Sequence, residues 1–323
     1  MALIPAEFSL IYKHFRPLAG QGALDLGDDA AVFTPPPGRE MVIAADAMVE
    51  GVHFLPDDPP DLIARKLLRT NLSDLAAMGA APFGYLLTVS VRRDTADGWF
   101  AGFAAGLAAD QAEYDIALLG GDTTSTPGPV SLSLTILGTV SPGTALRRTG
   151  ARPGDGVWVS GTIGDGALGL LAATGRLGDA DGYLAGRYRL PRPRVGLGVR
   201  LAGIATAAMD VSDGLVQDLG HLCRGAGLSA TIQAALVPLS AAARVAVAAQ
   251  PGLLARCLAG GDDYELLLAV PESREGALCE AAAACGVAVT RIGAFAAGAA
   301  EVTVTGADGH AMDLEARGWS HFA

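Results

Sequence analysis

Residues 71–79 read NLSDLAAMG, and they close a run of sequence that predicts an amphipathic helix from about residue 61. Leu67, Asn71 and Asp74 recur three or four residues apart, so their side chains share one face of this helix. Because that face is otherwise apolar, we expect the Asp74 carboxylate to point toward the interior. A buried carboxylate without a partner is costly or becomes protonated, so a positive partner is expected.

Lysine is scarce in this chain, which holds only Lys13 and Lys66. A bound cation is therefore favoured over a lysine as the partner of Asp74. The alternative is an aspartate that caps or hydrogen-bonds a helix without any ligand. The other acidic motifs of the chain decide between these interpretations.

The composition is that of a folded, acidic protein. The 323 residues are enough for two domains, 50% of them are hydrophobic, and the formal net charge is -11. An acidic chain without a basic stripe is not expected to bind nucleic acid. If it handles phosphates, it needs metal ions as intermediaries.

The cysteines and the N-terminal residues indicate a cytoplasmic protein. All four cysteines lie in the C-terminal half and form no C-x-x-C pair, which is typical of reduced thiols. Glu7 and Lys13 interrupt the apolar N-terminal residues, so no signal peptide is predicted. No apolar run approaches ~18 residues, so no membrane span is expected.

In the first half, carboxylates follow turns and apolar strands. Asp28 and Asp29 follow a glycine, and such a pair is either a solvated turn or bridged by a cation. An apolar run predicts a strand that ends at Asp46, and residues 115–119 predict a strand that delivers Asp122 after two glycines. Strand ends are where α/β proteins place ligand groups.

A domain boundary is predicted at residues 145–155, which are polar and contain Gly and Pro. It separates residues 1–144 from residues 145–323. The first part has four predicted strands interleaved with helices, and the second restarts with a strand at residues 157–160. The predicted fold class is therefore α/β or α+β in two domains.

Glycines at positions 161, 164 and 166 lie between that strand and a predicted helix, a pattern typical of a phosphate cradle. Their spacing matches neither G-x-G-x-x-G nor G-x-x-x-x-G-K-[ST]. Neither lysine follows such a loop, so a Walker-type kinase is excluded.

Residues 209–215, MDVSDGL, open another predicted helix near Ser212. Backbone N–H groups at such a helix start face an anion, and Asp210 and Asp213 can hold a metal ion beside it. A capping interaction explains one of these two carboxylates without a metal, but not Asp210.

Two more motifs complete the chain. Residues 260–266, GGDDYEL, contain the second GGD of the chain and precede a predicted strand. The aromatic tail at residues 318–322 is predicted to dock on the body of the protein.

Aspartate dominates these motifs, at turns or strand ends and, for Asp74, near the end of a predicted helix, in otherwise apolar or glycine-rich surroundings. The set comprises Asp28, Asp29, Asp46, Asp74, Asp122, Asp210 and Asp213. Short carboxylates suit Mg²⁺, which prefers oxygen ligands. The set is too large for one ion, so several Mg²⁺ ions that bridge phosphates are predicted, as in phosphoryl transfer.

The ordered set of motifs resembles one known family. The motifs are GDDAAV, VEGVHF, NLSDLAAMGA, GGDT, DVSDGL and GGDDYEL, and in this order they resemble those of the thiamine-monophosphate kinases. This family belongs to the superfamily of aminoimidazole-ribonucleotide synthetase-like ATP enzymes, and the resemblance spans residues 8–322.

The resemblance implies an aminoimidazole-ribonucleotide synthetase-like fold of two domains, with mixed sheets flanked by helices. The N-terminal domain is expected to bind ATP and Mg²⁺ and to join a homodimer, and the C-terminal domain to complete the ATP and substrate site. The implied reaction is ATP-dependent phosphorylation of thiamine monophosphate to thiamine diphosphate, by direct in-line transfer assisted by several Mg²⁺ ions. Because the attacking phosphate oxygen is already anionic, no general base is needed, and no catalytic residue is assigned beyond the metal ligands.

The resemblance also implies roles for individual positions. The implied Mg²⁺ ligands are Asp29, Asp46, Asp74, Asp122, Asp210 and Asp213. The implied ATP contacts are Gly121, Asp122, Arg148 and Ser212. The implied thiamine monophosphate contacts are His53, Asp262 and Trp319. Taken alone, a histidine between apolar neighbours, as His53 is, is more often structural than catalytic.

The chain departs from the family pattern at some of these positions. Ala44 and Ala45 stand where the family often has Ser or Thr before Asp46, so any metal contact there must use a backbone carbonyl or water. Asp262 stands where Glu is frequent, and its shorter side chain changes the reach of that contact. Trp319 offers a flat ring that can stack on the thiamine ring system.

Several alternatives stay open at the level of sequence. Relatives that make selenophosphate carry a reactive Cys or selenocysteine with a Lys near the N-terminus, and hydrogenase-maturation relatives end in a reactive Cys; this chain shows neither feature. A metal-dependent nucleotide-binding protein without catalysis and a multi-metal phosphohydrolase are alternatives of other classes.

Overall fold

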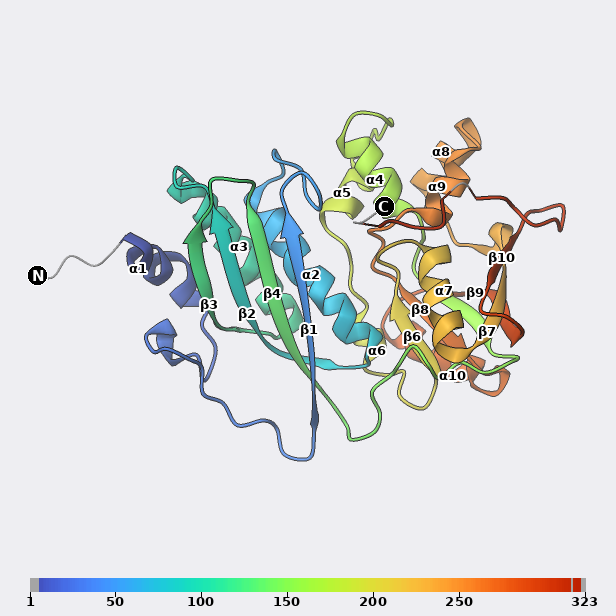
Figure 1. Ribbon diagram of the computed structural model, residues 1–323, viewed down its shortest axis with the longest axis horizontal. Helices are drawn as coiled ribbons and strands as arrows, with labels where there is room; N and C mark the ends of the chain where they lie inside the picture. The colour runs from blue at the N-terminus through green and yellow to red at the C-terminus, as the bar shows by residue number, and fades with distance from the viewer. Residues whose placement is uncertain (1–5, 315, 321–323) are drawn as a thin grey trace, which may run out of the picture. The chain divides into compact units, whose positions relative to one another are not determined.

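The computed structural model describes residues 6–314 and 316–320, which form two units (Figure 1). Unit 1 comprises residues 1–75 and 81–142, and unit 2 comprises residues 76–80 and 143–323. Each unit contains one mixed sheet with helices, which confirms the predicted fold class. The roles expected for residues 1–144 and 145–323 stay predictions.

Unit 1 is built on a four-stranded sheet in the order β1-β4-β2-β3. The strands are β1 Glu40–Val49, β2 Ala81–Val91, β3 Leu118–Ser125 and β4 Ser131–Val140. β4 pairs antiparallel with both β1 and β2, and β2 pairs parallel with β3. β1 and β3 are therefore the edge strands of this sheet.

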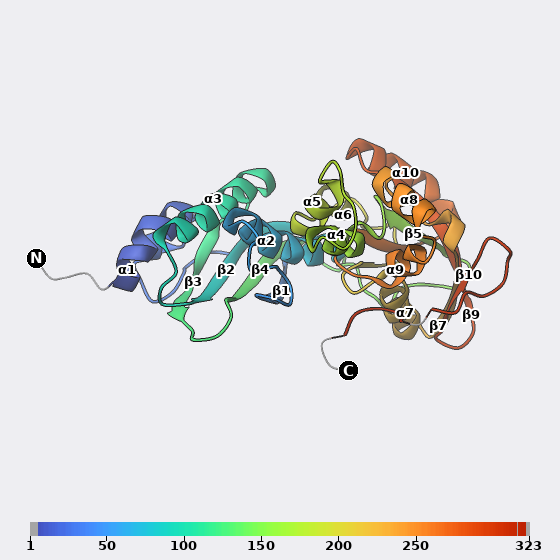
Figure 2. The ribbon, with the colours of Figure 1, turned by 90° about the horizontal axis from the view of Figure 1, so that it is seen from above.

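Helices cover one face of this sheet. They are α2 Pro60–Ala77 and α3 Asp97–Tyr114, and Figure 2 shows both on the same side of the strands. The strand residues on that face, such as Leu132, Leu134 and Leu87, are buried. On the opposite face Ile43 and Leu86 are exposed. Alternate residues of a strand point to opposite faces, so this alternation of buried and exposed residues is that of a sheet covered on one side.

The N-terminal residues of unit 1 form short helical turns. They are α1 Ala6–Leu10, the π-helical η1 Ile11–Phe15, and the 3₁₀ turns η2 Arg16–Leu18 and η3 Leu24–Leu26. Phe15 and Leu18 are buried and anchor this segment. The acidic turn at Asp28 and Asp29 follows it and is exposed.

Unit 2 is built on a six-stranded sheet in the order β10-β7-β9-β5-β8-β6. The strands are β5 Gly156–Ser160, β6 Ala207–Asp210, β7 Leu228–Gln233, β8 Leu266–Val270, β9 Val289–Ala297 and β10 Val302–Thr305. Only β10 and β7 pair in parallel, and the other neighbours are antiparallel.

Both faces of the second sheet are covered. The helices are α4 Asp165–Ala173, α5 Tyr183–Arg189, α6 Val195–Gly198, α7 Leu215–Ala226, α8 Ala241–Ala249, α9 Leu253–Ala259 and α10 Glu275–Ala284, with 3₁₀ turns η4 Ala234–Leu236 and η5 Glu272–Arg274. α7 lies on one side of the sheet and α10 on the other (Figure 2). Leu267 packs in the core that contains α7, whereas Leu268 packs in the core that contains α10. β8 is consequently buried along its whole length, which explains its uninterrupted apolar sequence.

Two predicted strand ends are wrong. β1 continues past Asp46 to Val49, and β3 contains Asp122 instead of ending before it. Both strands lie at sheet edges, where a polar side chain keeps access to solvent and does not interrupt the hydrogen-bonded ladder.

None of the helices within the described residues has both the length and the apolar character needed to cross a membrane.

Candidate functional site

Asn71 relates two of the predicted metal ligands of unit 1, Asp46 and Asp74. Its side chain is buried, its Oδ1 accepts the backbone N–H of Asp46 at 3.1 Å, and its Nδ2 donates to the Leu67 carbonyl at 2.9 Å. Asp74 follows one helical turn later on the same face of α2. Asn71 thus brings Asp46 of β1 to the face of α2 that carries Asp74. Both carboxylates are half-buried, so Asp74 is less enclosed than the helical pattern predicts.

His53 is held by the loop between β1 and α2. Its Nδ1 accepts the backbone N–H of Val49 at 2.9 Å, which leaves the proton of the neutral ring on Nε2. The buried Lys66 of α2 donates to the His53 carbonyl at 2.9 Å. One of the two lysines of the chain therefore fixes the backbone of a predicted substrate contact.

The two remaining predicted ligands of unit 1 are both exposed. Asp29 is exposed in the turn after η3, and Asp122 is exposed on β3. The strand pairing aligns Asp122 of β3 with Thr88 of β2. Asp46 of β1 is aligned, across β4 and β2, with Gly121 of β3, the residue before Asp122. Side chains of successive residues alternate between faces, so the pairing places Asp46 and Asp122 on opposite faces of the sheet.

In unit 2, a buried carboxylate organises the loop that carries Asp210, Ser212 and Asp213. Oδ2 of Asp218 accepts the backbone N–H groups of Ser212, Asp213 and Gly214, each at 3.1 Å. The helix starts later than predicted, at Leu215, so these three N–H groups belong to the loop just before it, and they do face an anion. That anion is the side chain of Asp218, because a helix start offers several unpaired donors that a nearby carboxylate can accept.

Three carboxylates are crowded around this loop. Burial raises the pKa of Asp218 to about 7, and the nearby charges of Asp210 and Asp213 contribute to this rise in the same direction. Asp210 is itself buried at the end of β6. Concentrated negative charge of this kind is relieved by a cation, and carboxylate oxygens are the donors that Mg²⁺ prefers. The loop therefore fits a Mg²⁺ ion chemically.

Within the described part of the chain, no preformed metal centre accompanies this charge. Across residues 6–314 and 316–320, no three His, Cys, Asp or Glu side chains are grouped so that they could hold a metal ion together.

The glycine turn before α4 also binds an internal carboxylate. Asp263 is fully buried and accepts the N–H groups of Gly164 at 2.7 Å and of Gly166 at 2.9 Å. Burial raises the pKa of Asp263 well above its ordinary value. The interpretation of this turn as a phosphate cradle is wrong for these two amides, because Asp263 occupies them.

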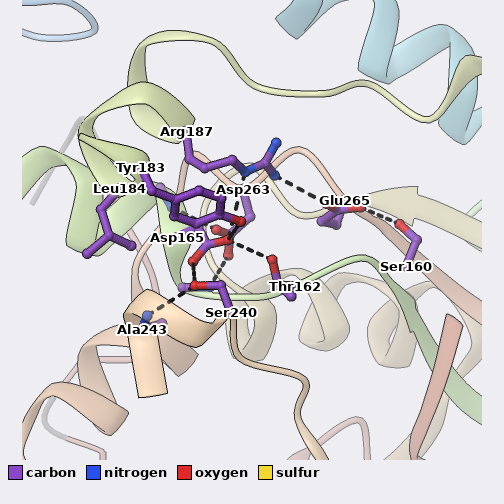
Figure 3. Close-up of polar contacts among 12 residues, drawn as sticks. Ser160, Thr162, Asp165, Tyr183, Leu184, Arg187, Ser240, Ala243, Asp263 and Glu265 are labelled. Carbon is purple, nitrogen blue, oxygen red and sulfur yellow. Dashed lines mark hydrogen bonds and ion pairs between the residues drawn. The ribbon is translucent and has the colours of Figure 1, made fainter. Parts of the chain in front are cut away.

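A network of charged and hydroxyl groups surrounds this turn (Figure 3). Asp165 accepts hydrogen bonds from Thr162 at 2.6 Å and from Ser240 at 2.6 Å. Arg187 lies between Asp165 and Glu265, with an Arg187–Glu265 distance of 3.2 Å.

Glu265, which is fully buried, anchors the end of the GGDDYEL turn. It accepts from Ser160 of β5 at 2.7 Å and from Arg194 at 2.6 Å. A buried carboxylate with this many donors keeps its position, so the network immobilises the turn that carries Asp262.

The GGDDYEL turn is bonded directly to the DVSDGL loop. The N–H of Asp262 donates to the Ser212 carbonyl at 2.9 Å, and the N–H of Tyr264 donates to the Val211 carbonyl at 2.8 Å. Asp262 and Tyr264 have φ angles of 70° and 53°, in the left-handed region that non-glycine residues seldom adopt. The structure therefore holds Asp262 beside Ser212 in a conformation that the surrounding contacts must maintain.

The C-terminal segment reaches the same loop. The N–H of Trp319 donates to the Asp213 carbonyl at 2.9 Å, and the indole side chain is 55% exposed. Docking of the tail is thus confirmed at Trp319, while His321 and Phe322 lie outside the described residues.

Arg148 lies near the same helix. It is exposed in the segment between β4 and β5. Its backbone carbonyl lies beside α7, because a Cβ on Gly225 of that helix would approach it to 2.9 Å. Burial lowers the pKa of His221 on the same helix, and the charges of Arg224 and Arg148 lower it further. Unit 2 consequently gathers Asp210, Ser212, Asp213, Asp262 and Trp319 around the start of α7, whereas the Arg148 carbonyl lies near Gly225 in the last turn of that helix.

Asn71, Asp218 and Asp263 are the residues that sequence reasoning missed as organisers of the site. Asn71 had a signal, because it shares a helical face with Asp74. Asp218 had a weaker one, an acidic residue in the first turn of a helix. Asp263 had none, because its partner amides lie 97 and 99 residues away in the chain.

Comparison with known proteins matches both units. Residues 27–140 match the family described as AIR synthase related protein, N-terminal domain, and residues 152–305 match AIR synthase related protein, C-terminal domain. Thiamine-monophosphate kinase of Caulobacter vibrioides is 48% identical over 307 residues, which covers 91% of this chain and 85% of that protein.

Solved structures show the same similarity. The crystal structure of thiamine-monophosphate kinase from Stenotrophomonas maltophilia K279a is 41% identical, covers 95% of this chain and 98% of that chain, and superposes with a TM-score of 0.85. A structure described as AaThiL complexed with AMPPCP and TMP is 28% identical, covers 100% of this chain and 99% of that chain, and has a TM-score of 0.78.

Proposed function

This chain belongs to the AIR synthase related family and, within it, to the thiamine-monophosphate kinases, and from this premise we propose how it phosphorylates thiamine monophosphate with ATP. The relative AaThiL, described in complex with AMPPCP and TMP, supports ATP and thiamine monophosphate as the two substrates. The product is thiamine diphosphate. We place the enzyme in the cytoplasm, where ATP is available.

The proposed chemistry is a direct in-line transfer. An oxygen of the thiamine monophosphate phosphate forms a bond to the γ-phosphorus of ATP. The bond from that phosphorus to the β,γ-bridging oxygen breaks, and ADP leaves with the electron pair. Because the nucleophile is already anionic, no side chain has to remove a proton.

The proposed metal ligands are the six aspartates that the family pattern implies. They are Asp29, Asp46, Asp74 and Asp122 in unit 1, and Asp210 and Asp213 in unit 2. When bound, several Mg²⁺ ions would screen the repulsion between the two phosphate groups and orient their oxygens. The crowding of Asp210 and Asp213 against the buried Asp218 supports a cation at the start of α7.

The substrate contacts are proposed from the same pattern. ATP is assigned to Gly121, Asp122, Arg148 and Ser212. Thiamine monophosphate is assigned to His53, Asp262 and Trp319.

The observation that carries the proposal is the bonding of the GGDDYEL turn to the DVSDGL loop. It holds a residue assigned to thiamine monophosphate, Asp262, against one assigned to ATP, Ser212. Transfer between two bound phosphates requires such fixed proximity, since effective molarity depends on the reacting groups being held in place.

A homodimer joined through unit 1 is also proposed. The open face of the four-stranded sheet exposes Ile43, at 64%, and Leu86, at 41%, on strands whose other face is packed. Apolar side chains on an uncovered sheet face favour association with another surface, and a second copy of the chain is the partner that the family resemblance implies.

The test is a product assay by chromatography with MgATP and thiamine monophosphate. Controls receive free thiamine or no acceptor. We expect thiamine diphosphate and ADP in equal amounts, and only with the monophosphate. ADP released without an acceptor would indicate a phosphohydrolase, and MgATP binding without any turnover would indicate a nucleotide-binding protein; either result would refute the proposal.

A further inference from the structure

Gln217, in the first turn of α7, bridges two residues of the proposed site. Its Nε2 donates to Oδ2 of Asp213 at 3.2 Å and to the carbonyl oxygen of Trp319 at 2.7 Å. The N–H of Trp319 donates in turn to the carbonyl of Asp213 at 2.9 Å. The three residues therefore form a closed set of hydrogen bonds between α7, the DVSDGL loop and the C-terminal segment.

The C-terminal segment passes very close to Gln217. A Cβ atom placed on Gly318 would lie 2.4 Å from the Cβ of Gln217 and 2.5 Å from its Cδ. Real side chains do not approach so closely, so a larger residue at position 318 would push the segment away from α7. Gly318 thus allows the close approach of the C-terminal segment to α7, and Gln217 holds the segment there by a hydrogen bond.

Asp213 is held independently of this contact. Its N–H is bonded to Asp218, and the neighbouring Gly214 N–H is bonded to the same oxygen. Loss of the Gln217 amide should therefore release the segment that carries Trp319, while the loop that carries Asp213 keeps its backbone conformation.

We propose that Gln217 is a positioning residue that ties Trp319 to Asp213, and so holds the aromatic contact for thiamine at a set place relative to the phosphate-binding loop. The inference rests on the proposed function, because it takes Trp319 as a thiamine monophosphate contact and Asp213 as a metal ligand. It adds a residue that is assigned to neither substrate and acts through the side chain of Asp213 and the backbone carbonyl of Trp319. Its loss should weaken binding of thiamine monophosphate more than it slows the transfer step.

The test compares three variants of the full-length protein. Gln217→Met keeps the length of the side chain but removes the donor, and Gly318→Ala disturbs the same contact from the other side. Gln250→Met is the matched control, because Gln250 is an exposed glutamine at the C-terminal end of α8 and takes part in none of these hydrogen bonds.

The first readout is hydrogen exchange at residues 316–320 in the protein without substrates. We expect the Trp319 amide to exchange about tenfold faster in Gln217→Met and in Gly318→Ala, as for the loss of a hydrogen bond of ordinary strength. The Gln250→Met control should match the wild type. Unchanged exchange in both variants would refute the tether.

The second readout is steady-state kinetics. We expect the KM for thiamine monophosphate to rise about tenfold in both variants, with kcat and the KM for MgATP within about twofold of wild type. Faster exchange with an unchanged KM would refute the positioning role. A wild-type protein that makes no thiamine diphosphate would instead refute the proposed function, while the exchange experiment would still decide whether Gln217 holds the segment.

Discussion

At the scale of single residues, the acidic side chains of unit 2 divide into two kinds. Asp218 and Asp263 are buried and accept backbone amides at the starts of α7 and α4. Asp213 and Asp262 are half-buried on the loops that those carboxylates organise. The first kind shapes the site, and the second kind is the one proposed to meet ligands.

Asp263 should make stability depend on pH. The pKa of Asp263 is raised in the folded protein, whereas an unfolded Asp titrates at about pH 4. Between these two pKa values, the folded chain keeps a proton on Asp263 that the unfolded chain has lost. Raising the pH through this range therefore favours unfolding. We expect the difference in free energy of unfolding between wild type and Asp263→Asn to fall as pH rises from about 5 to 8.

Urea unfolding followed by tryptophan fluorescence measures this difference. The substituted amide side chain cannot ionise but also loses an acceptor, so the Asp263→Asn variant is expected to be less stable at low pH, with the gap closing at high pH. A gap that is constant across the pH range would show that Asp263 has an ordinary pKa.

The metal assignment is tested most directly by removing single charges. Asp74→Asn and Asp210→Asn keep the size of each side chain and should lower kcat by about 100-fold or more, because oxygens of the transferring phosphoryl group lose charge compensation. Circular dichroism and thermal unfolding should show that both variants fold. Near-normal turnover in both would refute the proposal that these residues hold Mg²⁺.

At the scale of elements, α2 and α3 approach so closely that one position must be glycine. A Cβ on Gly106 of α3 would lie 2.2 Å from the carbonyl oxygen of Asp61 at the start of α2. A Cβ on Gly98 of the same helix would meet nothing within 4 Å. Substitution of Gly106 therefore tests the close packing of the two helices, whereas substitution of Gly98 tests helix propensity alone.

Alanine at these two positions should have opposite effects on the free energy of unfolding. We expect Gly106→Ala to destabilise by about 1–3 kcal/mol through overpacking. Gly98→Ala should leave stability unchanged or raise it by up to about 1 kcal/mol, since alanine favours helix. Thermal unfolding of both proteins measures this, and equal effects would contradict the close approach of the two helices.

Helix α2 also links packing to the proposed site. Its buried Leu67, Leu68 and Leu72 hold it on the sheet, and Asn71 on the same helix accepts the N–H of Asp46. Because β1 is an edge strand, that N–H is available to a side chain instead of a neighbouring strand. The position of Asp46 therefore depends on the packing of a helix, as well as on the strand that contains it.

At the scale of the whole molecule, the proposed homodimer depends on the open face of unit 1. Ile43→Glu places a charge on that face, and burying an unpaired charge opposes association. We expect wild type to have twice the chain mass of 32.7 kDa by light scattering, and Ile43→Glu to shift toward the monomer.

Val245→Glu is the matched control for this experiment. Val245 is 71% exposed on α8, which belongs to unit 2. This variant should keep the mass of wild type. A monomeric wild type, or a dimer unaffected by Ile43→Glu, would refute association through this face.

Much of the architecture could be read from local sequence patterns. The helix that ends in NLSDLAAMG, the buried strand after GGDDYEL and the mixed α and β character follow from apolar periodicity, which any segment carries within itself. The ordered acidic motifs also indicated the family, and the comparisons confirm it. These features can be predicted from residues that are close together in the sequence.

The tertiary structure alone decided which groups meet. A glycine turn followed by a helix looks the same in sequence whether its amides bind a phosphate or a protein carboxylate, and here Asp263 and Asp218 occupy the amides at two such places. Likewise, polar residues in β1 and β3 suggested strand ends, but edge positions let both strands continue through them. Hydrogen-bond partners and paired strands are often far apart in the chain, so a local sequence pattern does not show which of them meet.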